Sequence, residues 1–518
     1  PTAGDDAPSP AEAGRGRRRA VRSVFLRGMG VVYFIAFASF WTQAMGLIGS
    51  GGLLPIAGFL EGASEQLGAG RFWQFPTVFW FGASDAAIHA VCGIGCVAAI
   101  ALIVGFAPLP MTVVLWIGYL SLVSAGRVFM GYQWDALLLE AGLLTIFAAP
   151  IALRPRLAWP GEPSRVVVWL QRWLVFRLMF MSGAVKLASG DETWRGLTAL
   201  TRHFETQPLP NVLGWWAHQS PEWALAGATG GTLFLELVVP FFALGPRAAR
   251  LVAFFGLAGL QALILLTGSY GFFNLLSILL CLWLLDDAHL LRFCPRRWRR
   301  TRESAPVFKS RPSLKRLQHV ALVPLTAVVA LGSVYHLGNL AARWAGESIE
   351  WPDAVREPVR AASPFRAVNS YGLFANMTTS RPEIVVQGSD DGRTWKTYRF
   401  PYKPGELDRR PIQAAPHQPR LDWQMWFEAL HARRMLDAAR RPRPNPWFLR
   451  FLRQLLHGAD PVLGRLRENP FPDEPPTSVR ALVYPYRFSD PGARAETGRW
   501  WRRGEASTYV APIRLRER

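Results

Sequence analysis

The sequence predicts a polytopic α-helical membrane protein of about nine spans, followed by a β-rich (α+β, sandwich-like) extracytoplasmic domain. The 518-residue chain is 50% hydrophobic and only 18% charged, and its mean hydropathy is +0.12. Several stretches run for about 18 residues or more with almost no charge, which is the length that a helix needs to cross a bilayer. The last third of the chain is instead rich in Pro, charged and aromatic residues. Lipid is therefore the expected solvent for the first part of the chain.

The apolar stretches predict a transmembrane helical domain over residues 24–343, after a basic cytoplasmic tail at 1–23. Each stretch is continuous and poor in charge, so each is expected to form a helix. The third and the eighth are short for a full span. The nine predicted segments are 24–48, 82–105, 110–126, 134–152, 165–189, 222–243, 248–268, 272–286 and 318–343.

The charge of the connections predicts the orientation of these segments. If the N-terminus lies in the cytoplasm, the inside connections hold about 20 Lys and Arg, including ten between Arg292 and Arg316, whereas the outside connections hold about four. Cytoplasmic connections of membrane proteins carry such an excess. The first segment is too long for a signal peptide and lacks a small-residue cleavage site, so it is expected to stay as a span. We therefore expect a multi-pass inner-membrane protein with a cytoplasmic N-terminus and a periplasmic C-terminal domain.

The basic composition has a second possible meaning, which the distribution of charge disfavours. The chain carries 58 Lys and Arg against 37 Asp and Glu, a net charge of +21. A nucleic-acid partner is not predicted, because the basic residues concentrate between apolar segments. Only five of the 58 are Lys, which leaves 53 Arg and indicates a GC-rich, bacterial genome. None of the four Cys lies in the last third, so no disulfide framework is expected in the exported domain.

Ionisable residues inside the apolar segments are candidate functional residues, since they are costly in a bilayer. Counted from the outer boundary at about 1.5 Å per residue, Arg177 and Glu236 reach matching depth near the middle, where they could form a buried ion pair. Their pairing could be purely structural. The outer residues could also be interfacial side chains that reach toward water. The predicted outer cluster consists of Asp85, His89, Asp135, Glu140, Lys186 and His336.

Lys186 is the candidate for chemistry. It is the only Lys in the nine segments of a chain that otherwise uses Arg. A desolvated Lys can lose its proton, whereas Arg cannot, so a site that needs a neutral amine as base or nucleophile would require Lys. The alternative is an ammonium group paired with Asp191 or Glu192 at the membrane surface. We find no motif of a hydrolase, zinc protease or P-loop, and we predict no cofactor and no metal site.

The exported domain is predicted over residues 354–518. Residues 383–387 and 394–400 alternate polar with apolar residues around Asp390-Asp391-Gly392, which predicts a β-hairpin. Residues 481–488 and 508–515 predict two more strands, both at edges because each contains Pro. Residues 422–440 and 447–456 have helical periodicity. Trp423 and Trp426 lie on one helical stripe, which could form core or bind a client protein.

Five segments resemble those of the lipase maturation factors, and the resemblance runs over nearly the whole chain. They are GYQWDALLLEAG at 131–142, VKLASGDETW at 185–194, YGLF at 371–374, RPEIVV at 381–386 and PHQPRLDWQMW at 416–426. Animal members are polytopic proteins of the endoplasmic reticulum membrane that help secreted dimeric lipases fold, with a large luminal C-terminal domain. The resemblance implies a bacterial homologue that assists exported client proteins such as lipases.

A shorter resemblance concerns the membrane half alone. Residues 182–187, SGAVKL, followed by Trp194 and Gly196, are similar to the segment of vitamin K-dependent γ-carboxylases that carries their catalytic lysine, with Lys186 at that position. Two hypotheses follow. The chain is a membrane-bound maturation or assembly factor that acts by binding, or it is a membrane enzyme that acts on a lipid-soluble substrate in an outer-leaflet pocket around Lys186.

Overall fold

A computed structural model of the chain describes residues 17–153, 161–293, 312–438, 440 and 443–515. Three features of the sequence lie largely or wholly outside these residues: the basic tail up to residue 16, Cys294, and most of the basic run between Arg292 and Arg316.

Seven described helices are long and apolar enough to cross a membrane. Two of them end in a short extension: the 3-10 turn η3 (Arg127–Phe129) prolongs α7, and α14 (Val239–Phe242) follows α13 after one residue. The seven helices are α2 (Arg19–Trp41), α6 (Asp85–Val104), α7 (Pro108–Gly126), α9 (Arg165–Ala188), α13 (Glu222–Leu237), α15 (Arg247–Thr267) and α19 (Pro312–Ala345). They confirm the prediction of a polytopic helical membrane protein.

Two further apolar helices are shorter. α8 (Gln133–Ala148) has 16 residues, and α16 (Phe273–Cys281) has nine before the 3-10 turn η4 (Leu282–Leu284). At about 1.5 Å per residue both fall short of a hydrocarbon core of about 30 Å. The eighth predicted segment is thus short, as expected, but the third is not: α7 with η3 covers 22 residues, Pro108–Phe129.

Short helices fill the connections at both ends of the bundle. Between α2 and α6 lie α3 (Ala44–Ile48), α4 (Ile56–Leu67), η1 (Gly68–Gly70), α5 (Arg71–Gln74) and η2 (Val78–Phe81). Between α9 and α13 lie α10 (Glu192–Arg195), α11 (Ala199–Thr206) and α12 (Val212–His218). The others are α17 (Asp287–Phe293), α20 (Asp353–Ala362) and η5 (Ser363–Phe365).

The C-terminal region contains one antiparallel sheet with helices against it, so the β-containing domain is confirmed. The strands run in the order β2-β1-β3-β4, and β5 also pairs with β3. In the described residues, the predicted sandwich-like arrangement consists of this one sheet with α21 and α22 packed against it, and the two helices supply the apolar surface that a second sheet would provide. The elements are β1 (Arg381–Ser389), β2 (Lys396–Thr397), α21 (Arg420–Asp437), α22 (Pro446–Leu456), α23 (Asp460–Leu463), β3 (Ser478–Phe488), α24 (Pro491–Thr497), β4 (Trp501–Arg503) and β5 (Ser507–Ile513).

The predicted hairpin is confirmed, and its turn depends on one carboxylate. β1 pairs with β2 through Gln387 and Thr397. Asp391 accepts hydrogen bonds from the backbone N–H groups of Arg393 and Thr394, at 2.8 and 2.7 Å. These bonds favour the ionised form and hold the pKa of Asp391 well below its usual range.

The prediction that β3 is an edge strand is wrong, whereas β5 does lie at an edge. β3 pairs with β1 along one side and with both β5 and β4 along the other. Pro485 is tolerated because it lies after the β5 pairing ends at Val483 and before the β4 pairing begins at Tyr486. A proline lacks the donor that a continuous ladder would need there.

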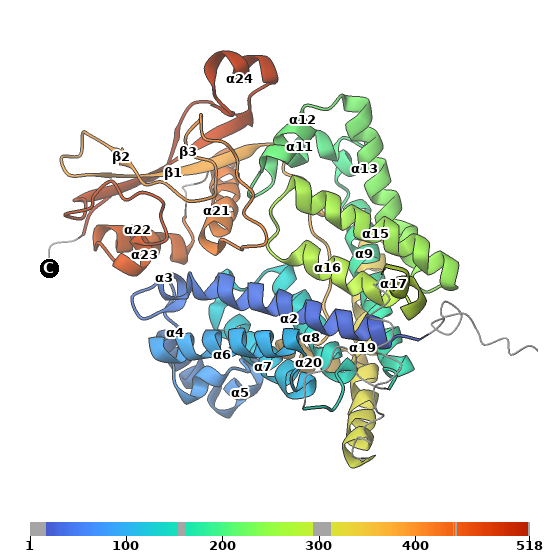
Figure 1. Ribbon diagram of the computed structural model, residues 1–518. Helices are drawn as coiled ribbons and strands as arrows, with labels where there is room; N and C mark the ends of the chain where they lie inside the picture. Colours follow the sequence, from blue (N-terminus) through green and yellow to red (C-terminus); the bar gives the residue numbers. More distant parts are fainter. Residues whose placement is uncertain (1–16, 154–160, 294–311, 439, 441–442, 516–518) are drawn as a thin grey trace, which may run out of the picture.

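The sheet region lies against one end of the helical bundle (Figure 1). α23 packs on α3, beyond the C-terminal end of α2. At the opposite end Asp287 accepts hydrogen bonds from the backbone N–H groups of Ala20 and Val21, at 2.8 and 3.0 Å. The N-terminal end of α2 and the sheet are therefore at opposite ends of the bundle.

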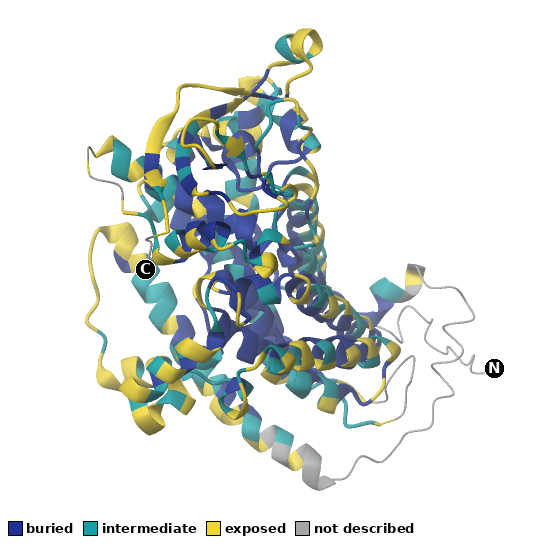
Figure 2. Cartoon of the chain, turned by 90° about the vertical axis from the view of Figure 1, so that its left-hand side faces the viewer, coloured by how far each residue is buried: buried dark blue, intermediate teal, exposed yellow. Residues whose placement is uncertain are grey.

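The hydrophobic core is continuous between the two halves of the chain (Figure 2). Trp423 and Trp426 on α21 are only 3% and 8% exposed. Trp423 packs edge-on against Trp134 at the start of α8, with ring centroids 4.7 Å apart. Of the two interpretations of this stripe, the burial of both rings favours core over a client-facing surface, because the stripe on α21 covers the membrane helices.

Candidate functional site

The predicted ion pair between Arg177 and Glu236 is not formed. Arg177 pairs with Glu140 on α8, and Glu236 pairs with Lys186. Arg177 and Lys186 are nine residues apart on α9, which is two and a half turns at 3.6 residues per turn, so they lie on opposite faces. One face meets α8 and the other meets α13. Matching depth alone could not tell which helices are neighbours.

Glu140 and Arg177 hold a segment of the C-terminal region inside the bundle. Both side chains are fully buried. The carboxylate oxygen Oε2 of Glu140 accepts hydrogen bonds from the backbone N–H and the side-chain amide of Asn369, both at 2.9 Å, and from the hydroxyl of Tyr371 at 2.6 Å. Arg177 donates to the carbonyl of Asn369 at 3.1 Å. Burying the Glu140 carboxylate would be costly without these partners, because a buried charge must be paired and hydrogen-bonded.

Asp135 forms a second buried link between the two halves. Its carboxylate accepts two hydrogen bonds from Arg420 on α21, each 2.8 Å long. Arg420 also donates to the carbonyl of Phe129 at 2.6 Å, and the hydroxyl of Tyr119 donates to Asp135. A bidentate Arg–carboxylate pair fixes orientation as well as distance. The sheet region is thereby held in one position on the bundle.

The six residues of the predicted outer cluster do not come together at one site. Asp135, Glu140 and Lys186 belong to three separate ion pairs. Asp85 accepts hydrogen bonds from the backbone N–H and the hydroxyl of Ser50. His89 accepts a hydrogen bond from the indole N–H of Trp41 at 2.7 Å. His336 on α19 interacts with the backbone of Val368. All six side chains have a partner elsewhere in the structure, which their depth in the membrane could not reveal.

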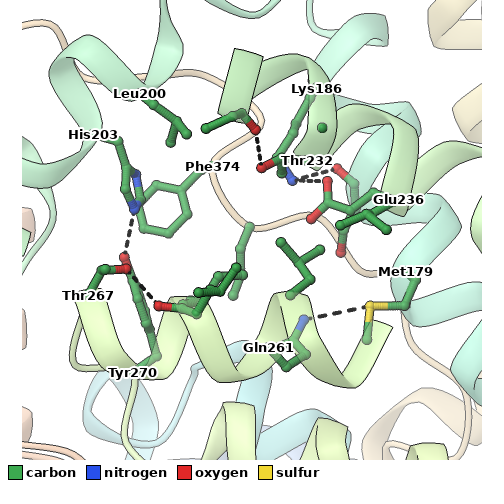
Figure 3. A pocket seen from close by; sticks show the side chains of 18 of the residues that line it. Met179, Lys186, Leu200, His203, Thr232, Glu236, Gln261, Thr267, Tyr270 and Phe374 are labelled. Carbon is green, nitrogen blue, oxygen red and sulfur yellow. Dashed lines mark hydrogen bonds and ion pairs between the residues drawn. The ribbon is translucent and has the colours of Figure 1, made fainter. Parts of the chain in front are cut away.

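A pocket lies between α9, α11, α13 and α15 and has Lys186 in its wall (Figure 3). Its volume is about 400 Å³. Most of its lining is aliphatic or aromatic, from residues such as Leu178, Leu235, Leu260, Ile264 and Phe374. Two polar groups face each other across this apolar space: the Lys186–Glu236 pair on one side and His203 with Tyr270 on the other.

Lys186 is fixed in the pocket wall by two acceptors. Its Nζ donates to Oε2 of Glu236 at 2.6 Å and to the carbonyl of Ser182 at 3.0 Å. The ammonium group also lies 5.1 Å from the centre of the Trp194 ring, a cation–π geometry. The expected partner, Asp191, instead accepts from the backbone N–H of Met377. Lys186 is thus a paired, buried cation.

His203 and Tyr270 form the polar wall opposite Lys186. The hydroxyl of Tyr270 donates to Oε1 of Gln207 at 2.9 Å, and Nε2 of His203 lies 3.2 Å from the same hydroxyl. Because the single Tyr270 proton goes to Gln207, His203 acts as the donor. Burial and the charge of Lys186 lower the pKa of His203 to about 4, so its ring is neutral at pH 7. Sequence reasoning missed both residues, since neither lies in a motif or a periodic pattern.

The described residues offer no cluster of side chains that could serve as metal ligands. Within the described ranges, no group of three or more His, Cys, Asp and Glu side chains is placed to hold a metal ion. The pocket offers instead hydrogen-bonding groups at two points of an apolar wall. This arrangement suits the binding and orientation of an amphipathic molecule.

Comparison with known proteins gives matches in both halves of the chain. Residues 20–292 match the lipase maturation factor transmembrane domain, and residues 367–511 match the lipase maturation factor C-terminal domain. Lipase maturation factor 2 of Xenopus laevis is 33% identical, with 96% of this chain and 83% of that protein covered. Lipase maturation factor 2 of Homo sapiens is 34% identical over the same shares, and lipase maturation factor 1 of Bos taurus is 34% identical over 95% of this chain and 88% of its own. No solved structure gives a significant match.

Proposed function

The chain belongs to the lipase maturation factor family, and we propose that it is a membrane-bound maturation factor that helps exported lipases to fold and assemble. The observation that carries this proposal is the extent of the similarity. It covers the membrane helices and the C-terminal sheet region together, over 96% of the chain. Similarity of the helical fold alone would not support a shared function, because one fold can serve many functions.

The buried links between the two halves support a binding role. Asp135 with Arg420, and Glu140 with Asn369 and Tyr371, fix the sheet region against the bundle. A rigid surface presented beside the membrane can hold a folding intermediate without making or breaking a bond. Because Trp423 and Trp426 are buried, client proteins would contact other side chains of this surface.

We further propose that the C-terminal region lies outside the cytoplasm of a bacterial cell. Loop charge predicts a cytoplasmic N-terminus. The described residues contain seven helices long enough to span, and an odd number of spans, seven or the nine predicted, places the two ends of the chain on opposite sides of the membrane. The N-terminal end of α2 and the sheet do lie at opposite ends of the bundle. Exported lipases would then meet the sheet region as they emerge from the membrane.

A transfer experiment tests the maturation function. The chain is expressed in animal cells whose own lipase maturation factors have been deleted, together with a dimeric secreted lipase. We expect secreted lipase activity to rise above that of cells with an empty vector. The control is the chain that ends at residue 350, which lacks the sheet region and should give no rise. If the full chain is inserted and abundant yet leaves secreted activity at the empty-vector level, the proposal is contradicted.

A further inference from the structure

We propose that the pocket beside Lys186 binds an uncharged lipid with one hydrocarbon chain and a hydroxyl-bearing head, of the monoacylglycerol class, which enters from the bilayer. This inference goes beyond the maturation function and does not depend on it. It rests on where the pocket opens, on the nature of its walls and on the state of its charged groups.

The pocket opens toward the side of the bundle. Ala228 on α13 and Leu263 on α15 both line it, and both are exposed, Leu263 by 61%. α13 and α15 are among the helices that are long and apolar enough to cross a membrane. Their exposed apolar side chains are expected to face lipid. A molecule dissolved in the bilayer can therefore reach the pocket without passing through water.

The size and the walls of the pocket suit a hydrocarbon chain. Its volume of about 400 Å³ falls within the range of small-molecule sites. Leu178 of α9, Leu235 of α13 and Leu260 of α15 present only aliphatic side-chain atoms, and the sulfur of Met179 accepts a hydrogen bond from the amide of Gln261. Such walls give water few partners, whereas a hydrocarbon chain gains contacts along its length.

The charges at the pocket favour an uncharged ligand. Among the described residues that line it, the ones that carry charge are Lys186 and Glu236, and they neutralise each other at 2.6 Å. His203 is neutral at pH 7. A fatty-acid carboxylate or a quaternary amine would therefore lose its hydration without gaining an unpaired counter-charge, which is costly in an apolar site.

The Lys186–Glu236 pair offers both a donor and an acceptor to a hydroxyl. An ammonium group has three hydrogens, and Lys186 donates two of them, to Glu236 and Ser182. Glu236 meets Lys186 through Oε2, and no described donor is bonded to its other oxygen. A hydroxyl can accept from the third hydrogen and donate to that oxygen. A glycerol head carries such hydroxyls next to an ester, and its chain would lie along the aliphatic side chains of α13 and α15, toward the mouth at Ala228 and Leu263.

Two glycines on α13 allow a matched test. A Cβ added at Gly231 or at Gly227 meets no atom within 4 Å, so both positions accept a side chain. Only Gly231 lines the pocket. Gly231→Phe should therefore fill the cavity, while Gly227→Phe adds the same bulk to the same helix outside it. Ala228→Trp, at the exposed mouth, serves as a second blocking variant if Gly231→Phe is not recovered folded.

The experiment is photo-labelling of the purified full chain in nanodiscs with a monoacylglycerol that carries a diazirine in its chain. We expect labelled peptides from α9, α13 and α15 in the parent and in Gly227→Phe, and loss of most of this label in Gly231→Phe or Ala228→Trp. Unlabelled monoacylglycerol should compete, and a fatty acid of the same chain length should not. Equal labelling of parent and blocked variants, or equal competition by the fatty acid, would overturn the proposal.

Discussion

Lys186 and Glu236 depend on each other, since both side chains are buried and each is the charge partner of the other. Removing one member of a buried ion pair leaves an uncompensated charge, whereas removing both can be neutral. The same logic applies to Glu140 with Arg177 and to Asp135 with Arg420. At the scale of single residues, the membrane half is therefore built from paired charges.

The Lys186–Glu236 pair gives the first prediction. Lys186→Met should lower the stability of the chain by about 3–5 kcal/mol, because Glu236 is left buried and unpaired. Lys186→Met with Glu236→Met should recover most of that loss. Thermal unfolding in detergent, followed by Trp fluorescence, measures both. If the double variant is no more stable than Lys186→Met, the unpaired charge of Glu236 is not the cause of the lost stability.

His417 predicts a dependence on pH. Burial and the charges of Arg420 and Arg465 lower the pKa of His417 to about 4, from an ordinary value of 6.5. Between these pH values the unfolded chain binds a proton that the folded chain does not, so stability is lost as pH falls from about 6.5 toward 4. One pKa unit corresponds to about 1.4 kcal/mol. Going from pH 6.5 to 5 should therefore cost up to about 2 kcal/mol through this residue.

The test compares His417→Gln with the parent. The side-chain oxygen of Gln can still accept a hydrogen bond from Ser39, which lies 2.9 Å from Nδ1 of His417. The melting temperature of the variant should fall less than that of the parent between pH 7 and pH 5. Asp422, whose pKa burial raises to about 6, acts in the opposite direction but equally in both proteins. Identical pH profiles would refute the assignment to His417.

At the scale of elements, the close approach of α9 and α13 brings Lys186 to Glu236. Gly183 makes this approach possible, since a Cβ there would lie 2.8 Å from Cβ of Glu236 and 3.0 Å from Cγ of Leu237. Any other residue would push the helices apart. The glycine in Ser182-Gly-Ala-Val-Lys186 is therefore explained by packing.

Gly183→Ala should destabilise the chain by about 1–3 kcal/mol, because the added methyl group overpacks the contact between α9 and α13. Gly227→Ala on α13 is the matched control, since its Cβ meets no atom within 4 Å. There the better helix propensity of Ala should raise stability by up to about 1 kcal/mol. Melting temperatures of the two variants decide. A Gly183→Ala protein that melts at or above the parent would contradict the packing argument.

Local patterns predicted the elements well, because each depends on few neighbours. The apolar stretches are helices in the structure, and the turn residues around Asp391 do connect the two strands of a hairpin. Partners across the molecule could not be predicted in this way. Glu140 meets Asn369 from 229 residues away, and Trp423 is buried against α8. Pro485 by itself predicts an edge strand, but it lies in the central strand β3, between the residues that pair with β5 and those that pair with β4.

At the scale of the whole molecule, the two halves share a hydrophobic core, the buried ion pair between Asp135 and Arg420, and the buried hydrogen bonds between Glu140 and Asn369. The sheet region is therefore expected to need the bundle in order to fold. Residues 1–350 and 351–518, expressed as two chains, should associate and purify together from the membrane. The fragment 351–518 alone should expose the α21 stripe and aggregate.

Arg420→Ala in the fragment 351–518 provides the control for this association. It removes the bidentate pair with Asp135 and leaves that carboxylate buried, so recovery with the 1–350 fragment should fall several-fold. Affinity purification through a tag on 1–350 gives the measurement. A fragment 351–518 that folds alone and is not retained by 1–350 would contradict the single shared core.

The central claim is that the chain matures exported lipases, and the specific activity of those lipases tests it most directly. The gene is deleted in the cell from which the chain comes, and lipase activity per mass of exported lipase is compared with and without the restored chain. We predict that deletion lowers this specific activity, with inactive lipase accumulating, and that the full chain restores it. Exported lipases with unchanged amount and unchanged specific activity after deletion would contradict the claim.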